Sequence, residues 1–323
     1  MEKTIKKDID NEKLFVSLAP HIRSNDTVRK IMLDVLIALT PAIIGSIYFF
    51  KLNAVILLLT CVISCVASEY VIQKLLKKEI RIYDLSAVVT GVLIAFNLPA
   101  TFPWWMAAFG SIFAIVIIKE CFGGIGCNFI NPALGARIVL MASWAKAMTN
   151  YSAPDGVSTA TPLQIIKEGT DLTILPKYFD MLIGNRAGVL GETSVILLLI
   201  GFIYLVIKKV VNLEIPIIYI ISTAIFLFLF KLPTELIPYE LISGGLILGA
   251  CFMATDYTTT PINKRGRLIF ALGCGIITAV IRVKGSLPEG VSYSICLMNV
   301  ATPLIDKLTR TSAYGEAKKW KNQ

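Results

Sequence analysis

A short segment near the middle of the chain carries a carboxylate followed by grouped hydroxyls. It reads Asp155-Gly-Val-Ser-Thr-Ala-Thr161, so Ser158 and Thr159 lie between the acid and the last threonine. The Asp-Gly pair is typical of a turn, and an ordinary loop would satisfy these residue types. The local sequence alone therefore does not separate a turn from a site of chemistry.

Two other segments combine asparagine and proline in a pattern that indicates helix starts. Asn131 precedes a proline in the segment 123–137, and Thr302 precedes one in the segment 290–306, which also contains Asn299. Asn or Thr before Pro predicts an N-cap and the first helical residue. Free N–H groups at such a start favour anionic or electron-rich groups, such as a flavin ring, its phosphate or an anionic solute.

The composition places these segments in a membrane. Of 323 residues, 55% are hydrophobic and 16% are charged, and the mean hydropathy is +0.72. A soluble domain has about a quarter of its residues charged. This excludes a cytosolic enzyme and a disordered regulator. The net charge of +9 is explained by basic cytoplasmic loops rather than by binding of nucleic acid.

Hydropathy predicts about ten transmembrane helices in an all-α polytopic protein. The apolar segments are at about 31–50, 54–73, 84–99, 103–120, 132–146, 192–207, 214–230, 240–255, 267–283 and 290–306.

The distribution of basic residues predicts the orientation. With the N-terminus inside, 23 of the 31 Lys and Arg residues fall in cytoplasmic segments and eight fall outside. Residues 1–30 then form a cytoplasmic lead-in without the pattern of a signal peptide, and 307–323 form a cytoplasmic tail. The long connection 147–191, which contains Thr161, lies outside; connections of this length are usually functional or disordered.

The odd number of predicted spans in each half of the chain predicts internal symmetry. Five spans in 31–146 and five in 192–306 enter the membrane from opposite faces, and each half ends in a short or proline-interrupted span. This is the pattern of two inverted repeats with broken helices and a central site. Two unrelated kinked helices would give a similar pattern. Within the broken spans, we expect Arg137 to pair with a flavin or with Glu120, and Asn128, Asn131 and Asn299 to contact a flavin or only to cap helices.

The remaining ionisable residues near the span ends are interpreted as solvated at the interface, in preference to functional groups at membrane depth. They are Asp34, Glu69, Asp84, Glu120, Asp256 and Asp306. The seven cysteines form no C-x-x-C pair and are interpreted as small buried hydrophobes, so no metal site is predicted.

Several motifs together resemble a known family. The segment Asp155–Thr161 resembles the flavinylation motif Asp-x-x-Ser-x-Ala-Thr of membrane flavoproteins. Phe122-Gly-Gly-Ile-Gly-Cys-Asn-Phe-Ile-Asn-Pro-Ala133 is similar to the family's central glycine-asparagine signature. The same holds for Ser17-Leu-Ala-Pro-His21, Phe252-Met-Ala-Thr-Asp256, Glu289-Gly-Val-Ser-Tyr293 and Asn299 through Asp306. The family joins the D subunit of the Rnf complex and the B subunit of the sodium-translocating NADH:quinone reductase. The resemblance is closer to the Rnf branch, because only about 30 residues precede the first span.

The resemblance implies a cofactor and a role. In the family, the last threonine of the motif, here Thr161, carries FMN through a phosphoester that a flavin transferase makes from FAD outside the cytoplasm. Asp155 and Ser158 would complete the recognition sequence. Relatives also hold noncovalent riboflavin. Asn131, Asn299 and Arg137 are the candidate flavin contacts here. No residue is expected to be catalytic by itself, because the flavin carries the redox chemistry.

The resemblance also implies partners and a location. The chain would relay electrons between the G and C subunits of an ion-translocating ferredoxin:NAD oxidoreductase, whose A, B and E subunits complete the complex, in a bacterial cytoplasmic membrane. The alternatives are a quinone-reducing subunit of the related complex and a small-solute channel, since inverted five-helix repeats resemble the urea-channel fold and fold does not fix function. The acceptor threonine separates the electron relay from a channel, which has no use for it.

Overall fold

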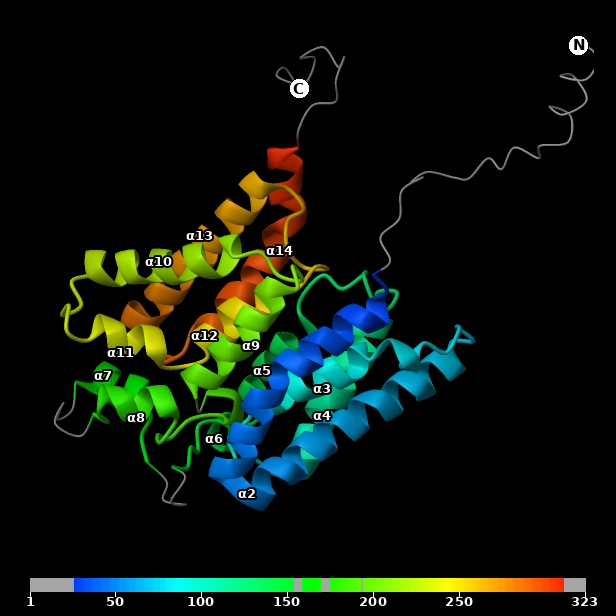
Figure 1. Cartoon of the computed structure of the whole chain (residues 1–323), viewed down its shortest axis with the longest axis horizontal. Helices are drawn as coiled ribbons and strands as arrows, with labels where there is room; N and C mark the ends of the chain where they lie inside the picture. The colour runs from blue at the N-terminus through cyan, green and yellow to red at the C-terminus, as the bar shows by residue number, and fades with distance from the viewer. Residues whose placement is uncertain (1–25, 154–158, 170–174, 193, 311–323) are drawn as a thin grey trace, which may run out of the picture.

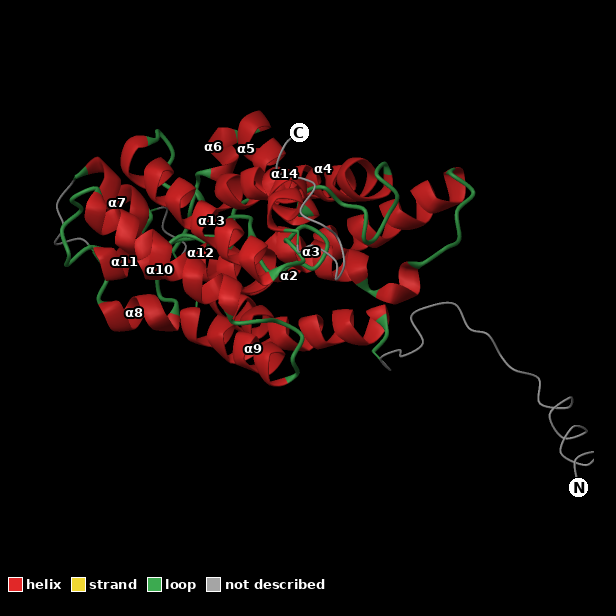
Figure 2. Ribbon diagram, turned by 90° about the horizontal axis from the view of Figure 1, so that it is seen from above, coloured by secondary structure: helices red, strands yellow, loops and turns green. Residues whose placement is uncertain are grey.

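A computed structural model describes residues 26–153, 159–169, 175–192 and 194–310. Within these ranges the regular structure is helical, apart from isolated bridge residues such as the antiparallel pair Pro99 and Val189 (Figure 2). Asp155 and Ser158 lie outside the described residues.

The first half of the chain is built around one long folded-back helix. Helix α2 runs from Val28 to Leu75 and is broken at Lys51, whose backbone has φ 50° and ψ −127°. Figure 1 shows its two arms lying as a hairpin. The apolar segments predicted at 31–50 and 54–73 correspond to these arms. They are followed by η1 (Ile82–Asp84), α3 (Ser86–Phe96), α4 (Trp104–Phe113), the π-helix η2 (Ala114–Glu120), α5 (Pro132–Ser143) and α6 (Ala145–Met148).

The connection predicted at 147–191 contains helices of its own, α7 (Pro162–Glu168) and α8 (Tyr178–Ile183). The second half then runs through η4 (Leu190–Glu192), α9 (Val195–Ile207), α10 (Glu214–Leu229), α11 (Ile237–Ile242), α12 (Leu246–Leu248), the π-helix η5 (Gly249–Met253), α13 (Lys264–Lys284) and α14 (Val291–Thr309). The start of α2 and the end of α14 lie toward one side of the molecule, and α7 and α8 lie at the opposite side (Figure 1).

The two halves share one apolar core. Helix α2 packs against α3, α4 and α9, α13 packs against α10 and α14, and α14 packs against α5. At one crossing, a Cβ added to Gly201 of α9 would lie 1.9 Å from the Ala38 carbonyl oxygen of α2. Only glycine allows this approach, which is the way that helices pack closely in a membrane.

The outer surface is apolar, as expected for contact with lipid. Large aliphatic and aromatic side chains on several helices are more than half exposed, among them Ile44, Tyr48, Ile63, Ile203, Ile207, Phe228, Leu229 and Val300. Soluble monomers rarely expose apolar surface on this scale. By length and composition, α2 and α13 are able to cross a membrane.

The break predicted at Pro303 is wrong. Helix α14 continues through this proline, and Thr302 is not an N-cap. Its hydroxyl donates to the Met298 carbonyl (3.1 Å) and to the Thr259 carbonyl (2.9 Å) from within the helix. The irregular backbone in the second half lies instead between α11 and α12, where Gly244 and Gly245 have positive φ. The predicted start of α5 is confirmed, because Asn131 is its N-cap and Pro132 its first residue.

Candidate functional site

Thr161 is the N-cap of α7 and forms a reciprocal capping box with Gln164. The Thr161 hydroxyl oxygen accepts from the Gln164 N–H (3.3 Å), and the Thr161 N–H donates to the Gln164 side-chain oxygen (2.9 Å). In this cap the threonine oxygen acts only as a hydrogen-bond acceptor, so the cap does not use the hydroxyl proton. A phosphoryl group in place of the hydroxyl proton is compatible with this geometry, so the residue fits a phosphoester. The side chain is half-buried.

A narrow pocket beside Thr161 brings together parts of the chain that are far apart in sequence. Its lining comes from Tyr151 and the start of α7, from the segment before η4 and the last residue of η4, from the turn between α11 and α12, and from the connection before α14. The residues are Tyr151, Pro162, Leu163, Arg186, Ala187, Glu192, Ser243, Gly244, Pro288 and Glu289. Thr161, the acceptor predicted from the motif, thus lies beside a buried polar cluster. This cluster consists of Arg186, Glu192 and Glu289 from the pocket lining and of Arg137, which pairs with Glu289.

Arg137 joins this cluster through Glu289 and does not pair with Glu120, one of the two partners predicted for it. The guanidinium of Arg137, 4% exposed, pairs with the Glu289 carboxylate and donates to the Asn97 side-chain oxygen (2.6 Å). Pairing with Glu120 is wrong, because Glu120 lies with Lys78 instead. The first turns of α5 direct Arg137 away from the loop that follows η2, toward the connection that precedes α14.

Arg186 fixes the other side of the same cluster. Its guanidinium, 5% exposed, donates to the backbone carbonyls of Glu192 (2.6 Å) and Ile242 (3.0 Å) and to the Ser243 hydroxyl (3.4 Å). These bonds hold η4 against the end of α11. The donors of this arginine thus go to two carbonyls and a hydroxyl rather than to the Glu192 carboxylate.

The Glu192 side chain titrates in an unusual range. Since α9 begins at Val195, Glu192 lies in the connection that precedes the helix, and not in the span predicted from residue 192. Burial and the nearby Glu289 carboxylate raise the pKa of Glu192 to about 7, against the opposing effect of Arg137 and Arg186. Sequence reasoning did not single out this residue; its only signal was an acid directly before an apolar segment.

Asn131 and Asn299, from the two asparagine-proline segments, are hydrogen-bonded to each other. Asn131 caps α5 by accepting from the N–H groups of Ala133 (3.0 Å) and Leu134 (3.4 Å), and its amide donates to the Met253 carbonyl (3.3 Å). The amide oxygen of Asn299 accepts from the Asn131 N–H, and its NH₂ donates to the Thr259 carbonyl, both at 3.2 Å in the orientation that satisfies the two partners.

A second, more apolar cavity lies on the other side of this junction. Asn131 lines it, whereas Asn299 and Arg137 do not. The polar lining residues are Ser86, Thr90, Lys119, Asn128, Asn131, Thr255, Asp256 and Thr258, with Phe252 and Tyr257 among the aromatic ones. The candidate residues are therefore divided between two sites. Asn131 borders this cavity, Arg137 lies in the cluster beside Thr161, and Asn299 supports Asn131 from α14.

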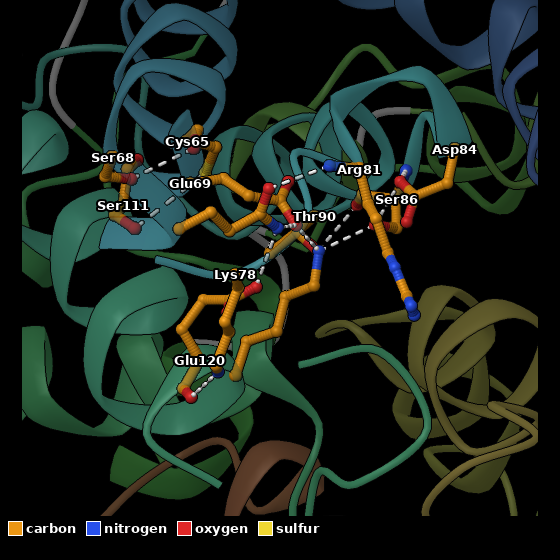
Figure 3. Close-up of polar contacts among 12 residues, drawn as sticks. Cys65, Ser68, Glu69, Lys78, Arg81, Asp84, Ser86, Thr90, Ser111 and Glu120 are labelled. Atoms are coloured by element: carbon orange, nitrogen blue, oxygen red, sulfur yellow. Dashed lines mark hydrogen bonds and ion pairs between the residues drawn. The ribbon is translucent and has the colours of Figure 1, made fainter. Parts of the chain in front are cut away.

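A buried charge network lies next to the second cavity, and interfacial solvation is the wrong interpretation for its acids. Figure 3 shows Glu69, Ser86 and Glu120 converging from different helices. Lys119 donates to the Glu69 carboxylate and to the Ser86 hydroxyl, each at 2.6 Å. Glu69, Lys119 and Glu120 are 1–2% exposed. No group of three or more His, Cys, Asp or Glu side chains suited to a metal occurs among the described residues.

The comparison with known proteins assigns the family. The sequence model of the NQR2, RnfD, RnfE family matches residues 15–315. The chain belongs to this family. The family resemblance drawn from the motifs is confirmed, and with it the membrane character that the composition predicts.

Three relatives illustrate the similarity, each of them the D subunit of its complex. The chain is 50% identical over 310 residues to the D subunit of the Na⁺-translocating ferredoxin:NAD⁺ oxidoreductase complex of Acetobacterium woodii. The alignment covers 94% of this chain and 96% of the relative. It is 42% identical to the D subunit of the proton-translocating ferredoxin:NAD⁺ oxidoreductase complex of Clostridium ljungdahlii, with 97% of this chain and 98% of the relative covered. It is 38% identical to the D subunit of the ion-translocating oxidoreductase complex of Stutzerimonas stutzeri, with 94% of this chain and 98% of the relative covered. The match extends over almost the full length of each relative, so it includes both polar sites.

Proposed function

We propose that this chain is the D subunit of an ion-translocating ferredoxin:NAD oxidoreductase complex and relays electrons through FMN esterified to Thr161. The single observation that carries the cofactor is the reciprocal cap at Thr161, which presents a half-buried hydroxyl oxygen beside a polar pocket within the motif Asp155–Thr161. The relatives carry the name of the complex, and their nearly complete coverage supports the same role here.

The chain's own residues hold the acceptor in place. Gln164 binds both the Thr161 N–H and its oxygen, and Pro162 restricts the backbone at the first helical position. Arg186 connects η4 to the end of α11 by donating to the carbonyls of Glu192 and Ile242. When bound, the flavin supplies the electron-accepting and electron-donating chemistry. The protein supplies attachment, spacing and a buried polar surround.

The cavity at the Asn131–Asn299 junction is proposed to take a second, noncovalent flavin, with riboflavin as the candidate. The support is its position between elements of both halves of the chain and its amide and hydroxyl lining, which offers partners to the carbonyl and ring-nitrogen acceptors of a flavin. Asn131 is the residue placed to contact it, and Asn299 holds Asn131.

The proposed architecture has ten spans in two inverted five-helix units, 31–146 and 192–306. The termini would lie in the cytoplasm and the Thr161 loop outside a bacterial cytoplasmic membrane. The basic-residue asymmetry supports this, as does the placement of α7 opposite the start of α2 and the end of α14 (Figure 1). Electrons would pass between the G subunit, on the outer side, and the C subunit, on the inner side, with a flavin transferase required for maturation. Na⁺ and H⁺ are both open as the coupled ion, since the relatives include each.

The deciding experiment is flavin fluorescence of the chain on a denaturing gel after expression with its flavin transferase. A fluorescent band that survives denaturation supports covalent attachment, and mass spectrometry of the 155–163 peptide assigns the residue. A colourless chain would contradict the proposal and favour the solute channel. Flavin on Thr159 or Ser158 would show that the motif is aligned wrongly.

A further inference from the structure

Two carboxylates meet in the pocket beside Thr161, and each leaves one oxygen unpaired. The atoms are Oε1 of Glu192 and Oε1 of Glu289, both buried without a hydrogen-bond partner in the described part of the chain. Glu192 is 8% exposed. A buried polar atom without a partner costs stability, so the pair needs an explanation beyond packing.

Both unpaired oxygens lie next to Gly245. A Cβ placed on this glycine would lie 2.6 Å from Glu289 Oε1 and 3.1 Å from Glu192 Oε1. Both oxygens therefore border the same small space, which exists because residue 245 has no side chain. The Arg137 Nη1 atom borders it too, at 3.8 Å from the same point.

The hydrogen bonds of the two nearby arginines do not reach the free oxygens in the described part of the chain. Arg137 pairs with the other oxygen of Glu289, and Arg186 donates to the backbone of Glu192. Tyr151 and Tyr293 also face the cluster. The Arg282–Glu240 pair borders it without adding net charge, since Arg282 donates to the carbonyls of Ser243 and Gly244. With both acids ionised, the two arginines and two carboxylates sum to zero, yet the free oxygens repel each other. One proton between them removes that repulsion and leaves the cluster with a charge of +1.

The free space argues for a proton over a metal ion. The pocket leaves about 10 Å³, which is about enough for one water molecule. A bare cation would need more oxygen ligands than two carboxylates supply, and no acidic group of three is present among the described residues.

We propose that Glu192 and Glu289 form a site for one proton, which fills when negative charge is added to a flavin on Thr161. This inference rests on the proposed function, because Thr161 lines the same pocket as both acids. One electron that reaches the flavin is accompanied by one proton that moves from water onto the pair. When the electron leaves, the proton returns to water. The net charge of flavin and cluster together is unchanged through the cycle.

The first test needs no flavin. Infrared difference titration of the purified Thr161→Ala chain between about pH 5 and 9 should show one protonated carboxyl band that disappears through the neutral range. Glu192→Gln and Glu289→Gln should each abolish the band, whereas Glu168→Gln, at an exposed acid of α7, should retain it. Absence of the band before mutation, or its persistence in both variants, would overturn the proposal. Loss of the band on adding Na⁺ at constant pH would overturn it in favour of a cation.

The second test uses the flavin-loaded complex. The reduction potential of the flavin on Thr161 should fall as pH rises, and Glu192→Gln should reduce that slope, while Glu168→Gln should not. Equal slopes in all three proteins would overturn the link to the flavin. If mass spectrometry finds no flavin on Thr161, the proposed function fails and the redox link fails with it. The infrared titration still decides whether the acids hold a proton.

Discussion

The backbone N–H of Asn131 donates to the side-chain amide oxygen of Asn299, 3.2 Å away. One residue is the N-cap of α5 and the other lies in the middle of α14, 168 positions later in the chain. The bond joins the two asparagine-proline segments directly. It also satisfies an N–H group that would otherwise be unpaired at a buried helix start, where water is absent.

Replacing Asn299 with leucine should impair electron transfer without affecting flavin attachment. The change leaves the Asn131 N–H unpaired, at a cost of about 1–3 kcal/mol, and releases the side chain that borders the second cavity. Asn131→Leu should have the same effect, and Asn212→Leu, at an exposed position, should be silent. Flavin reduction kinetics of the purified complex, normalised to folded protein, provide the measurement. Reduced yield with normal kinetics per molecule would mean that these residues only cap helices.

Thr161 variants should separate the chemistry of attachment from the cap. Thr161→Ala and Thr161→Val remove the hydroxyl and should abolish the covalent label. Thr161→Ser keeps the hydroxyl and should retain part of it. Thr159→Ala is the matched control and should label fully. Loss of the cap alone costs about 1 kcal/mol, too little to unfold the chain, so gel fluorescence can be read at equal protein amounts.

The α7 region should face away from the cytoplasm. A cysteine at the exposed Glu168 position is a better reporter than one at Lys167, whose ammonium donates to the Leu287 carbonyl. In a chain without its native cysteines, a membrane-impermeant maleimide should label residue 168 in intact cells. Cys121 and Cys127, both exposed in the loop after η2, restored one at a time, should label only after the membrane is opened. The reverse pattern would contradict the topology.

Patterns within one helix could be predicted from the sequence. The apolar segments overlap with observed helices, and the start of α5 follows from Asn131-Pro132, because capping is decided by adjacent residues. The same local logic failed at Thr302-Pro303. There α14 packs against α13 and α5, and this tertiary packing keeps the helix continuous despite the missing N–H.

Pairings between distant helices could not be predicted. Nothing near Arg137 in the sequence indicates Glu289, and Glu69 has the sequence context of an ordinary charge at the end of a span, although η2 places Lys119 beside it. Such pairs depend on the crossing geometry of several helices, which one sequence without an alignment does not specify. For Asp155 and Ser158, the motif resemblance is the only basis, since they lie outside the described residues.

The Glu69–Lys119 pair should make a double-mutant cycle strongly non-additive. Lys119→Met leaves a buried carboxylate without its partner, which costs about 3–5 kcal/mol. Glu69→Gln leaves a buried ammonium with a similar effect. The double variant removes both charges and should recover much of that loss. Thermal unfolding in detergent measures each step, with exposed Arg81→Met as the control. Additive losses would show that the pair is not coupled.

Glu192 should make the chain less stable as pH rises through the neutral range. Its pKa is raised to about 7 in the folded chain, from an ordinary value of 4.5 for a glutamate in the unfolded chain. Between these values the folded state holds a proton that the unfolded state has released, so the free energy of unfolding falls with pH until the folded acid ionises. Glu192→Gln cannot ionise and should flatten this decline, making the variant more stable than the parent at pH 8 relative to pH 5. Unfolding of the flavin-free chain at a series of pH values, with Glu168→Gln as the control, gives the comparison. A parallel decline in parent and variant would assign the pH dependence to another group.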